Sequence, residues 1–274
     1  MIDYKTYHYD SLKAGDVDPS ITALKYISNR FELNMEQRYW LSFLYGTCYC
    51  APTTFYMYNE FPDYINTDFN RLKKWWYEKK DKLIFQTDRM RIKSNNQFLD
   101  SFISYKNLVG NNQQKYFKSK SWTEMYSKIS GIKYFGRFSL FNYLDVLNSI
   151  TDVNLRPPYL NMLEAESCRN GVCYSMDRLD LVDKKSLSKV DLELLHNKFL
   201  YYLKNYEGNV FQIETTLCAY KKYRKGKRYI GFYIDRMYSE IKKIEQNVPD
   251  GICWDVLWEF REETFNIKNL IEKR

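Results

Sequence analysis

Apolar side chains recur at helical spacing along most of the chain. Ile132–Ile150 shows the strongest stripe, in which apolar residues repeat at intervals that place them on one side of a helix. Met35–Met57 is almost wholly apolar or aromatic, lacks clean alternation and contains Pro52, so we expect a pair of buried helices there. Helical spacing also appears in three further stretches, Ser20–Phe31, Leu72–Leu83 and Val190–Lys204. The pattern predicts a mainly α protein.

Turn-forming residues separate these stretches, but no long linker divides the chain. Asp18-Pro19-Ser20 is a good helix start, and the prolines in Leu155–Tyr159 mark a break. The polar, Asn/Gln-rich segment Gly110–Lys120 is expected to be a loop. We therefore predict a single compact helical domain over residues 1–274, with residues 1–18 as an N-terminal extension and a core over about residues 19–265.

The basic segment Lys221–Arg228 lies between two apolar, periodic segments. Six of its eight residues are cationic. Glu214 precedes it, and Tyr229, Tyr233 and Asp235 follow in a helical pattern. Such a local concentration of positive charge favours a phosphate-containing ligand. A solvated turn between two helices would have the same composition, so both interpretations stay open.

Aromatic residues are abundant, with 26 Tyr, 17 Phe and 6 Trp. Tyrosine suits half-buried surfaces that stack on planar ligands, although a low-GC genome enriches it as well. In Leu72–Leu83, Trp75 and Trp76 stand among lysines, which would suit base stacking and a grip on a nucleic-acid backbone. Equally, one tryptophan would belong to the core and the other would form a surface lid. The net charge of +8 is compatible with a polyanionic partner and is low for a protein that coats DNA.

Several classes of protein do not fit the sequence. It contains no apolar run long enough to span a bilayer and no apolar segment typical of a signal peptide. Its six cysteines are therefore expected to be reduced thiols in a cytoplasmic protein. Neither their spacing nor that of the two histidines suits zinc, and we expect no metal and no cofactor. Phosphate-binding loops, dinucleotide-binding turns, nucleophile elbows and metalloprotease helices are absent from the sequence.

Isolated arginines mark further candidate contacts to a ligand. Arg89 and Arg91 follow Asp88 at a predicted helix start, where backbone N–H groups add donors for a phosphate. Arg137 interrupts the apolar stripe, and a buried guanidinium requires a carboxylate or a bound phosphate. Arg169 stands beside Asn170-Gly171, which we interpret as a turn. For Arg137, a ligand contact and a structural salt bridge remain open.

An ordered set of segments resembles the phage amino acid:DNA transferases, which are grouped with the alpha-glutamyl/putrescinyl thymine pyrophosphorylases. The resemblance spans roughly residues 15 to 265, and no single motif in it is diagnostic. The segments are EQRYWLSFLYGTCYCAPTTFYMYNEFP (36–62), FQTDRMRIK (85–93), YFGRFSLFNYL (134–144), ESCRNGVCY (166–174), and IETTLCAYKK followed by KRYIGFYIDR (213–236).

The resemblance implies a helical phage enzyme related to the DNA-glycosylase type of fold. Such proteins act on 5-hydroxymethyluracil in DNA after it has been phosphorylated to a pyrophosphate ester. An amine or amino acid displaces pyrophosphate, which gives a hypermodified thymine. The implied partners are DNA with the modified base flipped out and an amine or amino-acid co-substrate. The expected state is a monomer in the host cytoplasm.

This reaction requires four kinds of residue, and the sequence offers candidates for each. A flipped base needs aromatic rings, and leaving pyrophosphate needs fixed positive charge. The amine must lose a proton to a carboxylate, and an amino-acid carboxylate can be held by a fork of donors. The candidates are Trp40, Tyr134, Tyr229 and Tyr233 for stacking; Arg89, Arg91, Arg137, Lys221 and Arg228 for phosphate; Asp88, Glu214 and Asp235 for the base; and Arg169 with Asn170 for the amino-acid carboxylate.

Two other functions agree with the same residues. A non-enzymatic phage protein would use a basic, aromatic face to hold DNA or to block a host factor. A base-excision glycosylase would keep a base-flipping pocket and use one aspartate to stabilise an oxocarbenium-like state. Structural roles also stay open for two of the candidates: Glu214 as an ordinary cap, and Asp235-Arg236 as a surface helix pair.

Overall fold

The structure is a computed structural model that describes residues 1–86, 97–119, 121–157, 166–249 and 254–265. Regular secondary structure within these ranges is helical, without strands, which confirms the predicted mainly α fold. The chain clusters into two compact units. Unit 1 consists of residues 1–19, 156–236 and 264–274, and unit 2 of residues 20–155 and 237–263. The prediction of a single domain and the relation to DNA glycosylases stay predictions.

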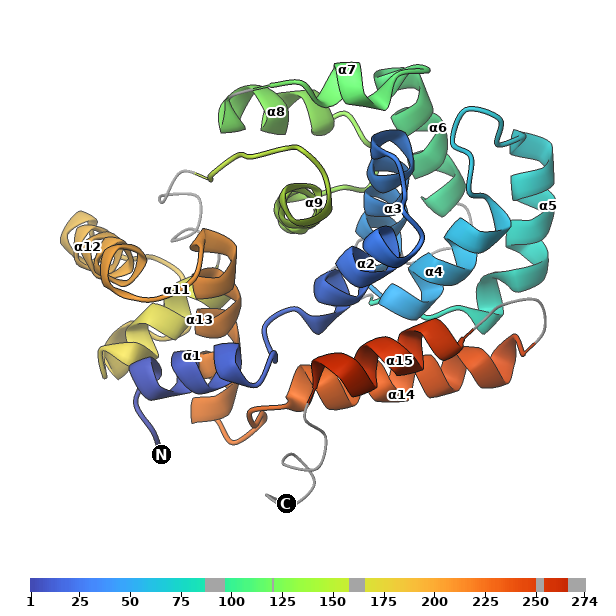
Figure 1. The fold of residues 1–274 in the computed structure, drawn as a ribbon. Helices are drawn as coiled ribbons and strands as arrows, with labels where there is room; N and C mark the ends of the chain where they lie inside the picture. The colour runs from blue at the N-terminus through green and yellow to red at the C-terminus, as the bar shows by residue number, and fades with distance from the viewer. Residues whose placement is uncertain (87–96, 120, 158–165, 250–253, 266–274) are drawn as a thin grey trace. The chain divides into compact units, whose positions relative to one another are not determined.

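Unit 2 is built around α3, which packs against α4 and α9 (Figure 1). A capping box at Asn34 starts α3, and Pro52 in the first turn of α4 confirms the expected pair of buried helices. The helices of this unit are α2 (Pro19–Arg30), α3 (Met35–Cys48), α4 (Ala51–Glu60), α5 (Phe69–Lys79), η1 (Lys80–Lys82), α6 (Gln97–Val109), α7 (Gln113–Phe117), α8 (Trp122–Ile129), α9 (Arg137–Ile150), the larger part of α14 (Phe232–Asn247) and α15 (Asp255–Thr264).

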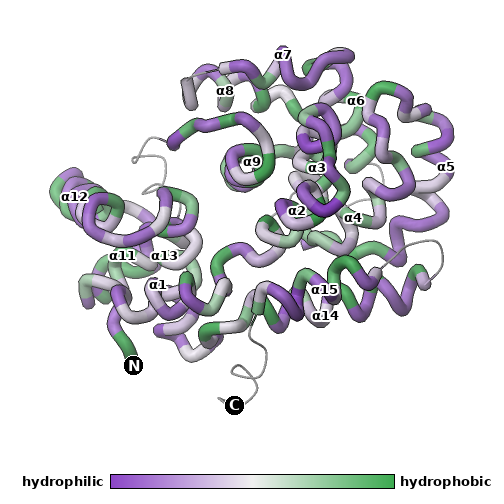
Figure 2. The backbone as a smooth tube through the Cα atoms, viewed as in Figure 1, coloured by the Kyte–Doolittle hydropathy of each residue, from purple (hydrophilic) through white to green (hydrophobic). Residues whose placement is uncertain are grey.

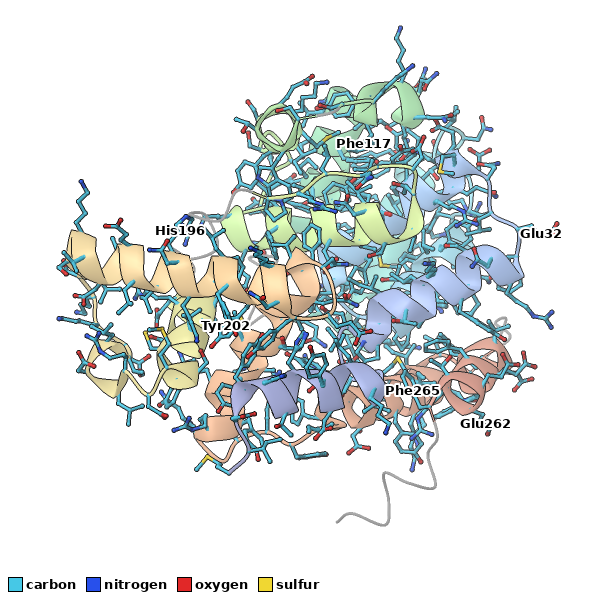
Figure 3. The ribbon with its side chains drawn as sticks, turned by 60° about the vertical axis from the view of Figure 1, so that its left-hand side comes forward. Glu32, Phe117, His196, Tyr202, Glu262 and Phe265 are labelled. Carbon is cyan, nitrogen blue, oxygen red and sulfur yellow. The ribbon has the colours of Figure 1, made fainter. Side chains whose placement is uncertain are left out.

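The core of unit 2 is aromatic. Phe43 stacks on Tyr105 with ring centroids 4.0 Å apart, and Tyr39 stacks on Phe117 at 4.9 Å. Figure 3 labels Phe117 within the dense packing of this unit. Many tyrosines are therefore core residues whose hydroxyl groups find internal partners. One example is the Tyr105 hydroxyl, which donates to Gln113 at 2.7 Å. The abundance of tyrosine is thus in large part a property of the core.

Two helix starts in unit 2 differ from the predictions. The apolar stripe expected from Ile132 becomes helical only at Arg137, because Gly136 is the N-cap of α9. The expected loop Gly110–Lys120 contains the short helix α7. The Glu36 carboxylate accepts hydrogen bonds from the first backbone N–H groups of α7, at 3.1 Å and 2.8 Å, and so stabilises this start.

In unit 1, α13 packs against α11, α1 and α12 (Figure 1). The helices are α1 (Tyr4–Lys13), α11 (Glu166–Ser175), η2 (Leu179–Leu181), α12 (Lys189–Asn205), α13 (Val210–Arg224) and the first residues of α14. The prediction of a turn at Asn170-Gly171 is wrong, because both residues lie inside α11. Gly171 is needed where α11 meets α13, since a Cβ there would lie 2.1 Å from the carbonyl oxygen of Leu217.

Residues 1–18, expected to be an extension, contribute α1 to the core of unit 1. Tyr4 and His8 are buried, and both contact the Thr216 hydroxyl of α13, at 3.0 Å and 2.9 Å. His8 also binds the Glu207 carbonyl at 2.7 Å, and burial lowers the pKa of its ring. Figure 3 shows Tyr202 on the side of α12 that faces α1, in agreement with its ring contact to Tyr4 at 4.8 Å.

Among the residues that the structure describes, no helix combines the length and the apolar character needed to cross a membrane.

Candidate functional site

The turn between α13 and α14 in unit 1 gathers the residues at the C-terminal end of the basic segment. Gly226 and Gly231 have φ values of +66° and +99°, which glycine adopts readily and other residues avoid. These two glycines lie in the connection that leads from the end of α13 at Arg224 to the start of α14 at Phe232. We refer to the residues gathered here as the Arg228 cluster: Asp16, Arg228, Tyr229, Phe232, Tyr233 and Asp235.

Asp16 fixes the start of α14. Its carboxylate accepts backbone hydrogen bonds from Gly231 at 2.8 Å, from Tyr233 at 2.8 Å and from Ile234 at 3.1 Å. Burial raises the pKa of Asp16 to about 6, although these bonds and the nearby Arg228 charge act in the opposite direction. Our sequence reasoning missed Asp16. The one local signal in the sequence was the position of Asp16 itself, an acidic residue two positions before the helix-start signal Asp18-Pro19.

Arg228 is the buried cation of the cluster. Its guanidinium carbon lies 4.2 Å from the ring centroid of Tyr233 and 4.7 Å from that of Phe232. The side chain is only 8% exposed, and its Nη1 donates no hydrogen bond within the described part of the protein. A buried guanidinium nitrogen without an acceptor is costly, and an anionic ligand would relieve that cost.

Tyr229 and Asp235 form the accessible edge of the cluster. The Tyr229 hydroxyl donates to the Asp235 carboxylate at 2.5 Å, while 44% of the Tyr229 side chain is exposed. Asp235 is half-buried. The Tyr229 ring contacts Phe232 at 5.9 Å, so one aromatic side chain links this pair to Arg228. The structure thus brings together four of the residues predicted from the sequence: Arg228, Tyr229, Tyr233 and Asp235.

Three of the six cations of the basic segment are ion-paired with acids of the same unit. Lys221 lies 3.4 Å from Asp183 and 3.9 Å from Glu166, and Lys225 lies 2.9 Å from Asp183. Arg224 pairs with Asp177 at 2.9 Å. The pKa of Asp183 is lowered, chiefly by the hydrogen bond between its carboxylate and Lys225. The segment is therefore far less positive than its sequence indicates, which weakens Lys221 as a phosphate ligand.

Arg169 and Asn170 hold the connection that follows α11. The Asn170 amide donates to the Asp183 carboxylate at 2.7 Å and accepts from the Asp183 backbone N–H at 2.9 Å. One Arg169 nitrogen donates to the Lys184 carbonyl at 3.0 Å. Asn170 is fully buried, so these contacts favour a structural role over capture of an amino-acid carboxylate.

Glu214 lies inside unit 1 on α13. Its side chain is 4% exposed, and its carboxylate accepts from the Cys218 thiol at 2.9 Å. Burial raises the pKa of the Cys168 thiol, with the Glu214 charge as the second cause. Of the candidate bases that the structure describes, Asp235 is more accessible to an incoming amine than Glu214.

The candidates in unit 2 are dispersed. Trp40 is fully buried, its indole N–H donates to the Phe61 carbonyl at 2.6 Å, and its ring stacks on Phe43. Its predicted role in base stacking is therefore wrong. Arg137 is exposed at the first position of α9, so the premise that it is buried is also wrong. Tyr134 is 38% exposed, and its hydroxyl lies 3.3 Å from Asp100. Asp88, Arg89 and Arg91 lie outside the described residues.

Unit 2 also contains a buried polar cluster that our sequence reasoning missed. Glu240, in the middle of α14, accepts from the Gln86 amide and lies 3.6 Å from the Cys50 thiol. Glu240 and Gln86 are 7% and 5% exposed. The Gln86 backbone donates to the Cys48 carbonyl at 3.0 Å, so this cluster ties residue 86 to the end of α3.

Neither thiols nor acids form a recognisable metal centre in the described ranges. No group of three or more His, Cys, Asp or Glu side chains with metal-binding geometry occurs there. The cysteines described as free are Cys48, Cys50, Cys168, Cys173 and Cys218. Burial raises the pKa of Cys48 to about 12 and that of Cys173 to about 11, so both stay protonated near neutral pH.

Comparison with known proteins gives two matches. A family model described as amino acid:DNA transferase matches residues 13–229. The chain is also 27% identical over 262 residues to a protein named serinyltransferase from Salmonella phage ViI, with 83% of this chain and 63% of that protein aligned. This chain thus spans less than two thirds of the length of the phage protein. The range of the family match includes Asp16, Arg228 and Tyr229, whereas Asp235 lies just beyond its end.

Proposed function

This chain belongs to the amino acid:DNA transferase family, and we propose that it transfers an amino acid to a modified base in DNA. The base is 5-hydroxymethyluracil carried as its pyrophosphate ester. The amine nitrogen bonds to the methylene carbon, the carbon–oxygen bond to pyrophosphate breaks, and pyrophosphate leaves with the bonding electrons. The proton lost by the amine passes to a carboxylate. We place the protein in the cytoplasm of the phage-infected host.

The observation that carries this proposal is the environment of Arg228. A guanidinium packed against two aromatic rings, buried and with an unpaired nitrogen, is a preorganised donor for an anion. Pyrophosphate gains negative charge as it departs, and a fixed cation stabilises that charge in the transition state. We therefore assign Arg228 to the leaving group.

Asp235 is the proposed base, and Tyr229 its partner at the accessible edge. An amino acid carries a protonated amine near neutral pH and must lose a proton to attack. The hydrogen bond from Tyr229 orients the Asp235 carboxylate. The exposed part of the Tyr229 ring is available to stack on a base that has left the helix.

The name of the phage relative makes serine the first amino acid to test. The experiment is mass spectrometry of nucleosides from DNA that carries the pyrophosphate ester, after incubation with the protein and serine, other amino acids or putrescine. A nucleoside that gains the mass of the amine, with release of one pyrophosphate per product, supports the proposal. An unchanged profile with every amine contradicts it and favours a DNA-binding protein. Release of a free base would instead indicate a glycosylase.

A further inference from the structure

The outer face of α5 in unit 2 is basic and has one exposed aromatic ring. Leu72, Trp75 and Trp76 are buried and form the inner side of this helix. Lys73, Lys74 and Tyr77 are exposed. On a helix, residues three and four positions apart are neighbours, so both lysines lie next to Tyr77.

Both tryptophans that had suggested base stacking belong to the core. Trp76 stacks on Phe98 with centroids 4.3 Å apart, and Trp75 meets Phe61 edge to face at 5.3 Å. The ring that remains accessible is Tyr77, which is 45% exposed and has the Lys80 ammonium 5.9 Å from its centroid. The aromatic character of the outer face therefore comes from tyrosine.

Positive charge dominates α5 together with η1. Residues 69–82 carry six basic side chains and two acidic ones. Lys73, Lys74, Lys79 and Lys82 lie beyond ion-pair distance of every carboxylate in the described ranges, whereas Lys80 approaches Asp81 at 3.9 Å. Figure 2 colours most of α5 as hydrophilic.

The basic segment at the end of α13 differs in this respect. There, three cations, Lys221, Arg224 and Lys225, form ion pairs with Asp183, Asp177 and Glu166. Lys73 and Lys74, which form no ion pair with an acid of the described residues, are available to bind successive phosphates. Both segments are basic in sequence, and the ion pairs distinguish them.

We propose that the outer face of α5, formed by Lys73, Lys74 and Tyr77, binds the phosphate backbone of duplex DNA outside the modified base. The proposal rests on the proposed function, because it assumes that DNA is the substrate. Each lysine that contacts a phosphate releases a condensed counterion, so binding through this face must depend on salt. Exposed ammonium groups on a helix suit such sequence-independent contacts.

The test compares two paired charge reversals in the full chain. The variant is Lys73→Glu with Lys74→Glu, and the matched control is Lys242→Glu with Lys243→Glu, an exposed pair on α14 in the same unit. Affinity for an unmodified duplex is measured by fluorescence anisotropy across a range of salt concentrations. Thermal unfolding of both variants shows that the fold is retained.

For the variant we expect at least a tenfold weaker Kd near 0.1 M salt, and a salt slope smaller by roughly 2, because about 0.9 of slope is lost with each phosphate contact. The control should keep the wild-type slope. Wild-type affinity and slope in a folded variant would overturn the proposal. Equal losses in variant and control would also overturn it, since they would indicate a general charge effect. Unmodified DNA is used, so the result does not depend on whether transfer occurs.

Discussion

The Asp16 carboxylate accepts a 2.8 Å hydrogen bond from the backbone N–H of Gly231, although 215 positions separate the two residues. This contact joins the segment after α1 to the first turn of α14. The same carboxylate accepts from Tyr233 and Ile234, so a single buried acid satisfies three of the donors that begin every helix. The turn that carries Arg228 is therefore fixed by contacts between two separate sequence segments of unit 1, residues 1–19 and 156–236.

The first prediction concerns the pH dependence of stability. The pKa of Asp16 is about 6 in the folded protein, above its ordinary value of 3.8, so the folded state binds more protons between these values. Stability from Asp16 is then fully present below about pH 4 and is lost as pH rises through 6, by an amount of order 3 kcal/mol. We expect the free energy of unfolding of wild type to fall across this window relative to Asp16→Asn.

Urea denaturation at several pH values measures this difference. Asp16→Asn should be less stable than wild type near pH 4, because an amide nitrogen cannot accept a hydrogen bond. The gap should narrow towards pH 7. Parallel profiles for the two proteins would show that Asp16 does not titrate in this range.

The second prediction concerns Gly231. Its φ of +99° lies outside the left-handed region near +60° that other residues can adopt. Gly231→Ala should therefore lower the free energy of unfolding by about 1–3 kcal/mol. Gly226→Ala is the matched comparison in the same turn: its φ of +66° also strains an alanine, but by less because it lies near +60°, and a Cβ there meets nothing within 4 Å. An equal loss in both variants would contradict the argument from φ.

The local part of the fold could be predicted from the sequence, because helical periodicity is a local property. The spacing of Leu72, Trp75 and Trp76 places all three on one face, and the structure buries all three. Their mixture with lysines had suggested a stacking surface, but the periodicity alone was the better guide. For Arg137 the periodicity was misleading. The helix begins only after the N-cap residue Gly136, so Arg137 lies at an exposed helix start and not within the buried stripe.

Long-range relationships could not be predicted in this way. Nothing near Asp16 in the sequence indicates a partner in α14. The acids that occupy the basic segment come from α11 and the connection after it, so its charge could not be judged from its own composition. The flanking residues Arg228, Tyr229 and Asp235 were identified because they belong to one short turn, where distance along the chain and distance in space agree.

The third prediction concerns the packing of α11 on α13. A Cβ at Gly171 would lie 2.1 Å from the Leu217 carbonyl oxygen. The nearest atoms all belong to the backbone of α13, so no flexible side chain can move aside. Gly171→Ala should lower the free energy of unfolding by about 3 kcal/mol or prevent folding. Gly131→Ala is the control, because its nearest neighbours are the Leu108 side-chain atoms at 3.1 Å, which can move. Chemical denaturation compares the two, and a tolerated Gly171→Ala would show that the helices can separate at low cost.

The last prediction concerns Asp235 as the base in amino-acid transfer. If its carboxylate accepts the proton of the amine, Asp235→Asn should lower kcat by roughly 10²- to 10⁴-fold and leave the Kd for DNA within about twofold. Activity of the variant should recover as pH rises, because more amine is then deprotonated in solution. Tyr229→Phe, which removes the 2.5 Å hydrogen bond to Asp235, should cost less, about tenfold. Asp10→Asn, at an exposed position of α1, serves as the control and should match wild type. If Asp235→Asn keeps the wild-type rate and pH profile while transfer is demonstrated, the proton goes to another acid, and the buried Glu214 becomes the next residue to test.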